Sequence, residues 1–198
     1  MINPLNTERL IIFPLHYGLI KCLLAHKTDE VEKLGFHTLN RWPEEDTLTF
    51  LPAVLKRLEE SDYFTGFETW MIVKKDDLSV IGDAGFKCLP DSKGATEIGY
   101  GIIEAERQKG YAFEAVSALV KWSFSQNNVL TIYADCLKEN YASIKTLQKC
   151  GFKKTYSDNS SIYWRLNRFS VSNPLFGKIL LLYNSLFNKR IEYNNFTQ

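Results

Sequence analysis

Apolar residues recur along this chain with two spacings, one typical of strands and one typical of helices. The central example is residues 97–103, an apolar strand interrupted by Gly99 and Gly101, followed by a helix that runs to about Gln126. In this helix the apolar residues recur every three to four positions, which predicts one buried stripe. The stripe consists of Ala112, Ala115, Val116, Leu119 and Val120.

Further strand patterns predict a mixed, mostly antiparallel sheet of about seven strands. The expected strands are residues 9–14, 67–75, 80–86, 95–103, 129–136, 152–156 and 162–166. Short turn-forming segments separate the second, third and fourth of them, which predicts a three-stranded antiparallel meander. A helix connects residues 95–103 to residues 129–136, so these two strands should be parallel. The last two strands should form a terminal hairpin.

Helical patterns precede the sheet. Leu19–Leu24 predicts a short helix, and Thr28 is a suitable N-cap for another that ends before Gly35. Leucines spaced from Leu48 to Leu58 predict an amphipathic helix with Pro52 in its first turns. The sequence therefore indicates an α/β (α+β) domain over residues 1–168.

Residues 169–198 form an extension beyond this domain. Residues 174–187 are apolar on almost all sides of a predicted helix. We expect this helix to pack back on the domain. The alternatives are a homodimer or partner contact and a helix lying on a membrane surface.

The connection between the central strand and the central helix has the composition of a phosphate-binding turn. Residues 107–112 follow the pattern Arg/Gln-x-x-Gly-x-Gly/Ala. A helix start offers up to four unpaired N–H groups and roughly half a positive charge, which favours a bound phosphate. Gly110 and Ala112 would let a phosphate approach the backbone closely, and Arg107 and Lys109 add positive charge.

Four motifs in sequence resemble the GCN5-related N-acetyltransferase (GNAT) family. They are Glu97-Ile98-Gly99-Tyr100, the turn at 107–112, Asn140-x-x-Ser143 and Cys150-Gly151-Phe152. The opening segment, Thr7 to Ile12, is similar to the first strand of the branch that includes the ribosomal-protein N-terminal acetyltransferases, the RimJ/RimL type. The resemblance covers roughly residues 6–168. It implies the GNAT fold, acetyl-CoA as cofactor and transfer of an acetyl group to a primary amine.

Composition agrees with one globular domain and excludes several other classes. The chain has 198 residues, 45% of them apolar, and a net charge of +1 with acids and bases interspersed. A nucleic-acid partner is therefore not expected, because such binders normally carry a basic face. Four separated cysteines and three separated histidines do not suggest a zinc site or a disulfide framework, and we expect no metal and a cytoplasmic location. We find no signal-peptide pattern and no apolar run long enough to span a membrane.

The resemblance assigns specific residues to the cofactor. It places the pyrophosphate on the N–H groups of the turn and the pantetheine arm along the preceding strand, where a bulge would open an acetyl pocket. Asn140 is also a favourable N-cap whose side chain should accept from the Ser143 N–H. The cofactor-binding residues are thus Ile102, Ile103, Arg107, Gln108, Lys109, Gly110, Tyr111, Ala112, Asn140 and Ser143.

The reaction also needs a base, because an amine is mostly protonated at neutral pH. Glu97 is the candidate, acting directly or through water; Asp83 and Asp158 are rivals. A strand-edge glutamate paired with a lysine is the structural alternative for Glu97. Many GNAT enzymes carry a tyrosine that protonates the departing thiolate, but Leu147 occupies the aligned position here. Ser143 is the expected substitute, so the predicted catalytic residues are Glu97 and Ser143.

The acceptor is expected between the N-terminal helices, the 36–45 loop and the terminal hairpin. Trp42, Trp70 and Tyr100, with Phe36, are the candidate lining residues. Two other functions remain open from the sequence. One is a non-catalytic acyl-CoA-binding regulator, and the other is an interaction module that uses residues 174–187.

Overall fold

The computed structural model describes residues 2–38, 41–61 and 64–168. The extension 169–198, and with it the expected apolar helix at 174–187, lies outside the described residues.

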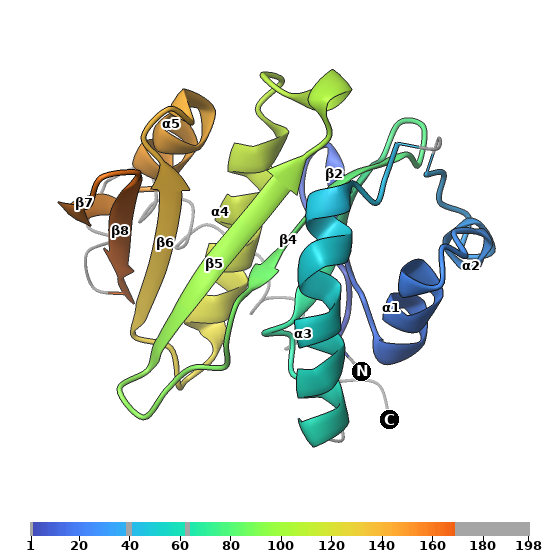
Figure 1. Cartoon of the computed structure of the whole chain (residues 1–198), viewed down its shortest axis with the longest axis horizontal. Helices are drawn as coiled ribbons and strands as arrows, with labels where there is room; N and C mark the ends of the chain where they lie inside the picture. Colours follow the sequence, from blue (N-terminus) through green and yellow to red (C-terminus); the bar gives the residue numbers. More distant parts are fainter. Residues whose placement is uncertain (1, 39–40, 62–63, 169–198) are drawn as a thin grey trace, which may run out of the picture.

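In the described part of the chain, eight strands form one sheet in the order β1-β2-β3-β4-β5-β6-β8-β7 (Figure 1). The strands are β1 (Leu5–Asn6), β2 (Leu10–Pro14), β3 (Thr69–Lys74), β4 (Val80–Phe86), β5 (Ala95–Ile102), β6 (Thr131–Leu137), β7 (Lys153–Ser157) and β8 (Ser161–Asn167). The seven predicted strands are all present, and β1 is a two-residue strand that the sequence pattern did not predict. The mixed sheet is confirmed.

The predicted connections are also confirmed. β3, β4 and β5 form an antiparallel meander, and β5 and β6 are parallel. β7 and β8 form the terminal hairpin, in which β8 inserts between β6 and β7. This arrangement puts β5 and β6 in the middle of the sheet, where a parallel pair joins two antiparallel halves.

Helices cover both faces of the sheet. They are α1 (Tyr17–Leu24), α2 (Asp29–Glu32), α3 (Glu45–Ser61), α4 (Tyr111–Ser125) and α5 (Tyr141–Lys149). α3 crosses the front of the sheet in Figure 1 and α4 lies behind it. Side chains alternate accordingly along β4: Phe86 contacts Trp122 of α4, whereas Asp83 bonds Thr47 of α3.

Most of the predicted α4 stripe is fully buried, as Ala115, Val116, Leu119 and Val120 have no exposed surface. Thr28 is the N-cap residue of α2, as predicted, although its side chain makes no capping hydrogen bond. Pro52 lies in the interior of α3 rather than its first turns, because the helix begins earlier, at Glu45.

Candidate active site

The sheet divides between β5 and β6. These strands pair only over Ala95–Glu97 and Thr131–Tyr133. Beyond that point β5 continues along β4 as far as Ile102, while β6 continues along β8 as far as Leu137. The second halves of the two central strands are therefore not paired with each other.

The backbone of β5 points hydrogen-bonding groups into this division. Lys87 N–H donates to Glu97 at 2.8 Å, and Ile103 N–H donates to Ile81 at 2.9 Å. In an antiparallel ladder every second residue bonds the partner strand. Tyr100 and Ile102, which lie beyond the segment paired with β6, thus direct their N–H groups away from β4 and towards β6. A bound chain could satisfy these groups, since a backbone N–H inside a protein needs an acceptor.

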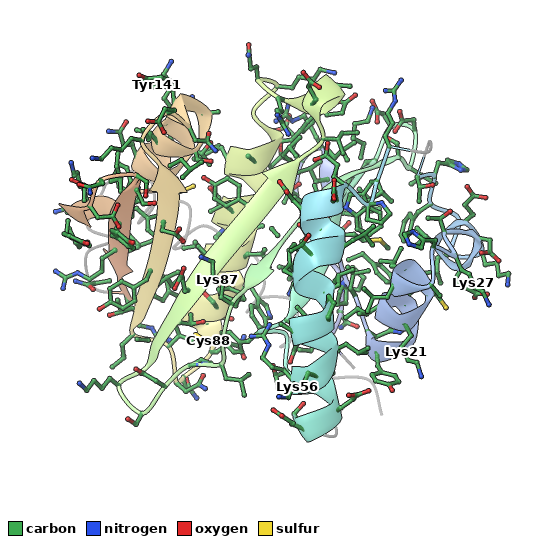
Figure 2. All side chains as sticks on the ribbon, in the orientation of Figure 1. Lys21, Lys27, Lys56, Lys87, Cys88 and Tyr141 are labelled. Atoms are coloured by element: carbon green, nitrogen blue, oxygen red, sulfur yellow. The ribbon has the colours of Figure 1, made fainter. Side chains whose placement is uncertain are left out.

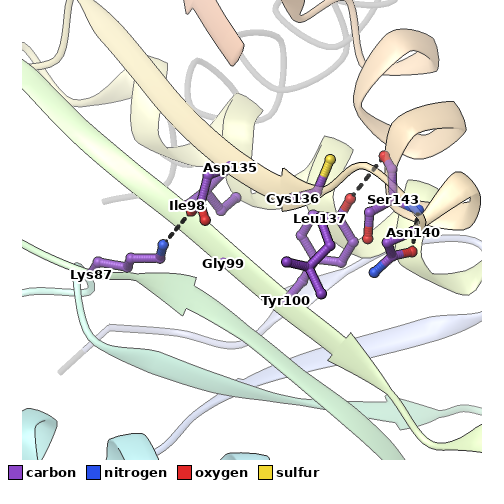
Figure 3. Close-up of a pocket in the computed structure, with 9 residues that line it drawn as sticks. All are labelled: Lys87, Ile98, Gly99, Tyr100, Asp135, Cys136, Leu137, Asn140 and Ser143. Carbon is purple, nitrogen blue, oxygen red and sulfur yellow. Dashed lines mark hydrogen bonds and ion pairs between the residues drawn. The ribbon is translucent and has the colours of Figure 1, made fainter. Parts of the chain in front are cut away.

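A cavity of about 270 Å³ lies at the division of the strands (Figure 3). Residues of β5, of β6 and of the start of α5 surround it, together with one lysine that follows β4. They are Lys87, Ile98, Gly99, Tyr100, Asp135, Cys136, Leu137, Asn140 and Ser143. Of the residues predicted from the sequence, the cavity brings together Tyr100, Asn140 and Ser143.

The predicted phosphate turn follows β5 through a short 3₁₀ turn (Glu104–Glu106) and ends at α4. Gln108 and Gly110 have positive φ angles of 65° and 85°. Within the described residues, no protein group accepts from the N–H groups of residues 108–112. The turn therefore presents the free donors that a phosphate requires.

The charged side chains of the turn are partly occupied within the protein. Arg107 donates through Nε to the carbonyl of Ile102 at 2.8 Å, so the last carbonyl of β5 has a partner. Lys109 forms an ion pair with Glu106 at 3.0 Å. The groups of the turn that lack a protein partner are therefore backbone N–H groups rather than the side chains of Arg107 and Lys109.

The start of α5 is built as the sequence predicted. The Asn140 side chain accepts from Ser143 N–H at 3.0 Å, which confirms the N-cap. The Tyr100 hydroxyl donates to the Ser143 carbonyl at 3.3 Å and so connects β5 to α5. Burial raises the pKa of Tyr100 above its ordinary value, so the phenol stays protonated at neutral pH. Leu147 is fully buried and provides no acid in this helix.

Glu97 is paired with a lysine. The Lys87 ammonium forms ion pairs with Glu97 and with Asp135, the latter at 2.5 Å. Figure 2 shows Lys87 on the sheet beside α3, and Figure 3 shows it directed towards Asp135. Partial burial lowers the pKa of Lys87, but hydrogen bonds to Asp135 and Glu97 outweigh that effect and raise the pKa. The Lys87 ammonium thus lies between two carboxylates, of which Asp135 lines the cavity and Glu97 does not.

Neither rival carboxylate lines the cavity. Asp83 is buried beneath α3, where it accepts from Trp42 Nε1 at 2.9 Å and Thr47 Oγ1 at 2.6 Å. Burial raises its pKa to about 6. Asp158 organises the β7–β8 turn, where hydrogen bonds from Ser161 N–H and the Tyr163 hydroxyl lower its pKa to about 2. Both therefore bond residues that do not line the cavity.

Four expectations need correction. Trp42 and Trp70 are 2% and 0% exposed, so they belong to the core and do not line the cavity. Ile103 cannot pair with a cofactor arm through its N–H, because Ile81 accepts that group. The register of β4 with β5 is regular from Ile98 to Ile102, so the division of the sheet does not depend on a bulge in β5.

Sequence reasoning missed Lys87 and Asp135. Asp135 alternates with buried residues in β6, and this alternation could have placed it on the same face as Tyr133. Lys87 directly follows Phe86, and only the register of β4 with β5 places it opposite Glu97.

Comparison with known proteins identifies the family. The model of the acetyltransferase (GNAT) domain matches residues 9–153. The chain belongs to the GNAT acetyltransferase family. This acetyltransferase is 32% identical over 160 residues to the Bacillus subtilis protein YjdG, named as an uncharacterized N-acetyltransferase; the match covers 81% of this chain and 95% of YjdG.

Two solved structures show the same fold. The structure of ribosomal-protein-S5-alanine acetyltransferase from Vibrio fischeri superposes on this one with a TM-score of 0.60 and a sequence identity of 16%. The match covers 84% of this chain and 97% of that protein. The structure of RimL, the ribosomal L7/L12 α-N-protein acetyltransferase in complex with coenzyme A, superposes with a TM-score of 0.57 and a sequence identity of 14%. The match covers 83% of this chain and 98% of RimL. The fold predicted from the sequence is confirmed.

The protein is thus an acetyl-CoA-dependent acetyltransferase, which favours an enzyme over the non-catalytic regulator considered from the sequence. Among the described residues, no helix has the length and apolar character needed to cross a membrane.

Proposed function

We propose that this acetyltransferase transfers the acetyl group to a primary amine, either a protein N-terminus or the amine of a small molecule. The amine attacks the thioester directly while both substrates are bound. The names of similar proteins support an amine acceptor: YjdG is called an N-acetyltransferase, and RimL an α-N-protein acetyltransferase. A spermidine N-acetyltransferase chimera with the same fold, from Vibrio cholerae and hSSAT, extends the range to small polyamines.

The division between β5 and β6 is the observation that carries the proposal. The free N–H groups of residues 108–112 hold the pyrophosphate, and the pantetheine arm runs back along β5 into the cavity. There it pairs with the N–H of Ile102 and occupies the place of the missing strand. The thioester then lies near Tyr100, whose N–H points into the same space and polarises the carbonyl.

The acceptor approaches from the side of Glu97 and Lys87. Glu97 takes a proton from the ammonium form of the acceptor, which makes the nitrogen nucleophilic. The nitrogen attacks the carbonyl carbon, the carbon–sulfur bond breaks, and the proton that the attacking nitrogen then loses is passed to the departing thiolate. Ser143 lies at the opposite wall of the cavity, where its hydroxyl holds the sulfur and relays that proton.

Free-thiol release from acetyl-CoA, measured with a panel of amines, tests this function. The panel contains spermidine, single amino acids, and short peptides with free or blocked N-termini. We expect thiol release that requires a primary amine, with a new amide identified by mass spectrometry. Ester formation on a hydroxyl acceptor, or thiol release at the same rate without any amine, would contradict the proposal.

A further inference from the structure

Arg9 joins the start of β2 to the phosphate turn. Its guanidinium donates through Nη1 to the carbonyl of Lys109 at 3.0 Å. Through Nε it donates to Glu114 at 2.7 Å, and its Nη2 lies 2.7 Å from the same carboxylate oxygen. The guanidinium carbon also lies 4.5 Å from the centre of the Tyr111 ring. Residues about 100 positions apart thus form one cluster at the first turn of α4.

The bond to Lys109 fixes the direction of the next N–H group. A trans peptide is planar, so its carbonyl and its N–H point in opposite directions. When Arg9 draws the Lys109 carbonyl towards β2, the N–H of Gly110 must point away from β2. Gly110 can adopt this arrangement because it tolerates its positive φ of 85°. One side-chain bond therefore helps to set the donor direction at the centre of the turn.

Arg9 also compensates a negative charge that would oppose a phosphate. Glu114 lies in the first turn of α4 with only 15% of its side chain exposed. Burial would raise its pKa, but hydrogen bonds from Thr7 and Arg9 hold the pKa below the ordinary value. The carboxylate is therefore ionised close to the pyrophosphate position, and the nearby positive charge of Arg9 balances it.

We propose that Arg9 is a positioning residue for coenzyme A: it orients the Lys109–Gly110 peptide and neutralises Glu114, so that the turn is ready for the pyrophosphate. The inference rests on coenzyme A binding at residues 108–112. Lysine could supply the charge but not the planar fork that reaches Lys109, Glu114 and the Tyr111 ring together.

Coenzyme A affinity by calorimetry, together with kcat and KM for acetyl-CoA, tests the role of Arg9. Arg9→Gln should weaken coenzyme A binding and raise KM about tenfold, while kcat changes less than about threefold. Arg9→Lys should lose less coenzyme A affinity than Arg9→Gln but stay weaker than the wild type, because the charge that balances Glu114 remains while the bond to Lys109 is absent. The double variant Arg9→Gln/Glu114→Gln should recover only part of the lost affinity, whereas a purely electrostatic role predicts full recovery.

Lys75→Gln is the matched control. Lys75 Nζ bonds the Thr7 carbonyl at 2.5 Å, so this change perturbs the same N-terminal segment without contacting the turn. Its coenzyme A affinity should equal that of the wild type. Folding is checked by circular dichroism, and Arg9→Lys decides the question if Arg9→Gln does not fold.

If the wild-type protein does not bind coenzyme A, the proposed role of residues 108–112 is wrong. Wild-type binding that is unchanged in folded Arg9→Gln or Arg9→Lys would reject the role of Arg9 alone.

Discussion

The donor half and the acceptor half of the proposed site are built from different kinds of groups. The donor half consists of backbone N–H groups. Those of residues 108–112 have no protein partner within the described residues, and those of Tyr100 and Ile102 lie beyond the part of β5 that pairs with β6. The acceptor half consists of side chains that already bond one another: Lys87 lies between Glu97 and Asp135. The same strand, β5, contributes to both halves.

The difference teaches how each half can bind a ligand. Topology leaves the donor groups free, because a helix start and a divided sheet cannot satisfy their own backbone. The acceptor side chains can rotate and pair, so a substrate must exchange with an existing partner. An ammonium substrate is suited to such an exchange, because Lys87 shows that the two carboxylates accept an ammonium.

The largest expected effect tests the acceptor half. Glu97→Gln should lower kcat by about 100-fold or more with little change in KM for acetyl-CoA, because it removes the base but not the cofactor site. Asp135→Asn is the matched comparison, since it also removes one carboxylate partner of Lys87. We expect it to retain activity within about tenfold. Equal losses in the two variants would assign the effect to the position of Lys87 rather than to a base.

The next effect tests the donor half. Gly110→Glu should weaken coenzyme A binding roughly 100-fold, because a side chain at positive φ is strained by about 1–2 kcal/mol and the new carboxylate repels phosphate. Calorimetric titration with coenzyme A measures the loss. Gly35→Glu is the control: Gly35 has the same φ of 85°, and nothing lies within 4 Å of its added Cβ. A similar loss in both variants would indicate general destabilisation.

A smaller effect concerns Asp83, a buried carboxylate outside the cavity. Burial raises the pKa of Asp83 to about 6. The folded state then holds a proton that the unfolded state loses between about pH 4 and pH 6, so this group lowers stability as the pH rises through that window. The free energy of unfolding of Asp83→Asn minus that of the wild type should therefore increase by about 2–3 kcal/mol from pH 4 to pH 7.

Urea unfolding at several pH values measures this difference. Asp91→Asn provides a contrast of opposite sign, because backbone hydrogen bonds from Ala95 and Lys93 lower the pKa of Asp91. A difference that does not change with pH would show that Asp83 does not titrate as a buried acid.

The smallest effect separates two roles of Asn140. Asn140→Ala should lower the free energy of unfolding by about 1 kcal/mol, because Ser143 N–H loses its capping acceptor. Asn140→Asp keeps a capping oxygen and should restore most of that stability. If the amide also contacts the cofactor, Asn140→Asp should still bind coenzyme A more weakly, which calorimetry can detect. Full binding in this variant would leave Asn140 with a capping role only.

Local features of the site could be predicted because they depend on neighbouring residues. The turn at 107–112 needs only a glycine with positive φ before a helix, and the cap at Asn140 needs only Ser143 three positions later. The strands of the meander and the parallel β5–β6 pair followed from apolar runs and connection rules. The family motifs then predicted that acetyl-CoA binds on these elements.

Long-range features could not be predicted in the same way. Trp42 and Trp70 are of a residue type that often lines pockets, but both are buried in the core. There Asp83 accepts from the indole N–H of Trp42, and the Gly66 carbonyl accepts from that of Trp70. Arg9 was noted only as part of a strand, and its contacts with Lys109 and Glu114 depend on how β2 lies against α4.

The sequence by itself therefore determined the elements, the glycine turn before α4 and the helix cap, since each is set by residue spacing within a few positions. Tertiary structure decided which side chains share the cavity. It set the register that places Lys87 opposite Glu97, and it divided β5 from β6, which frees the backbone groups for a cofactor. Packing across the whole sheet fixes this register and this division, and no local sequence pattern specifies that packing.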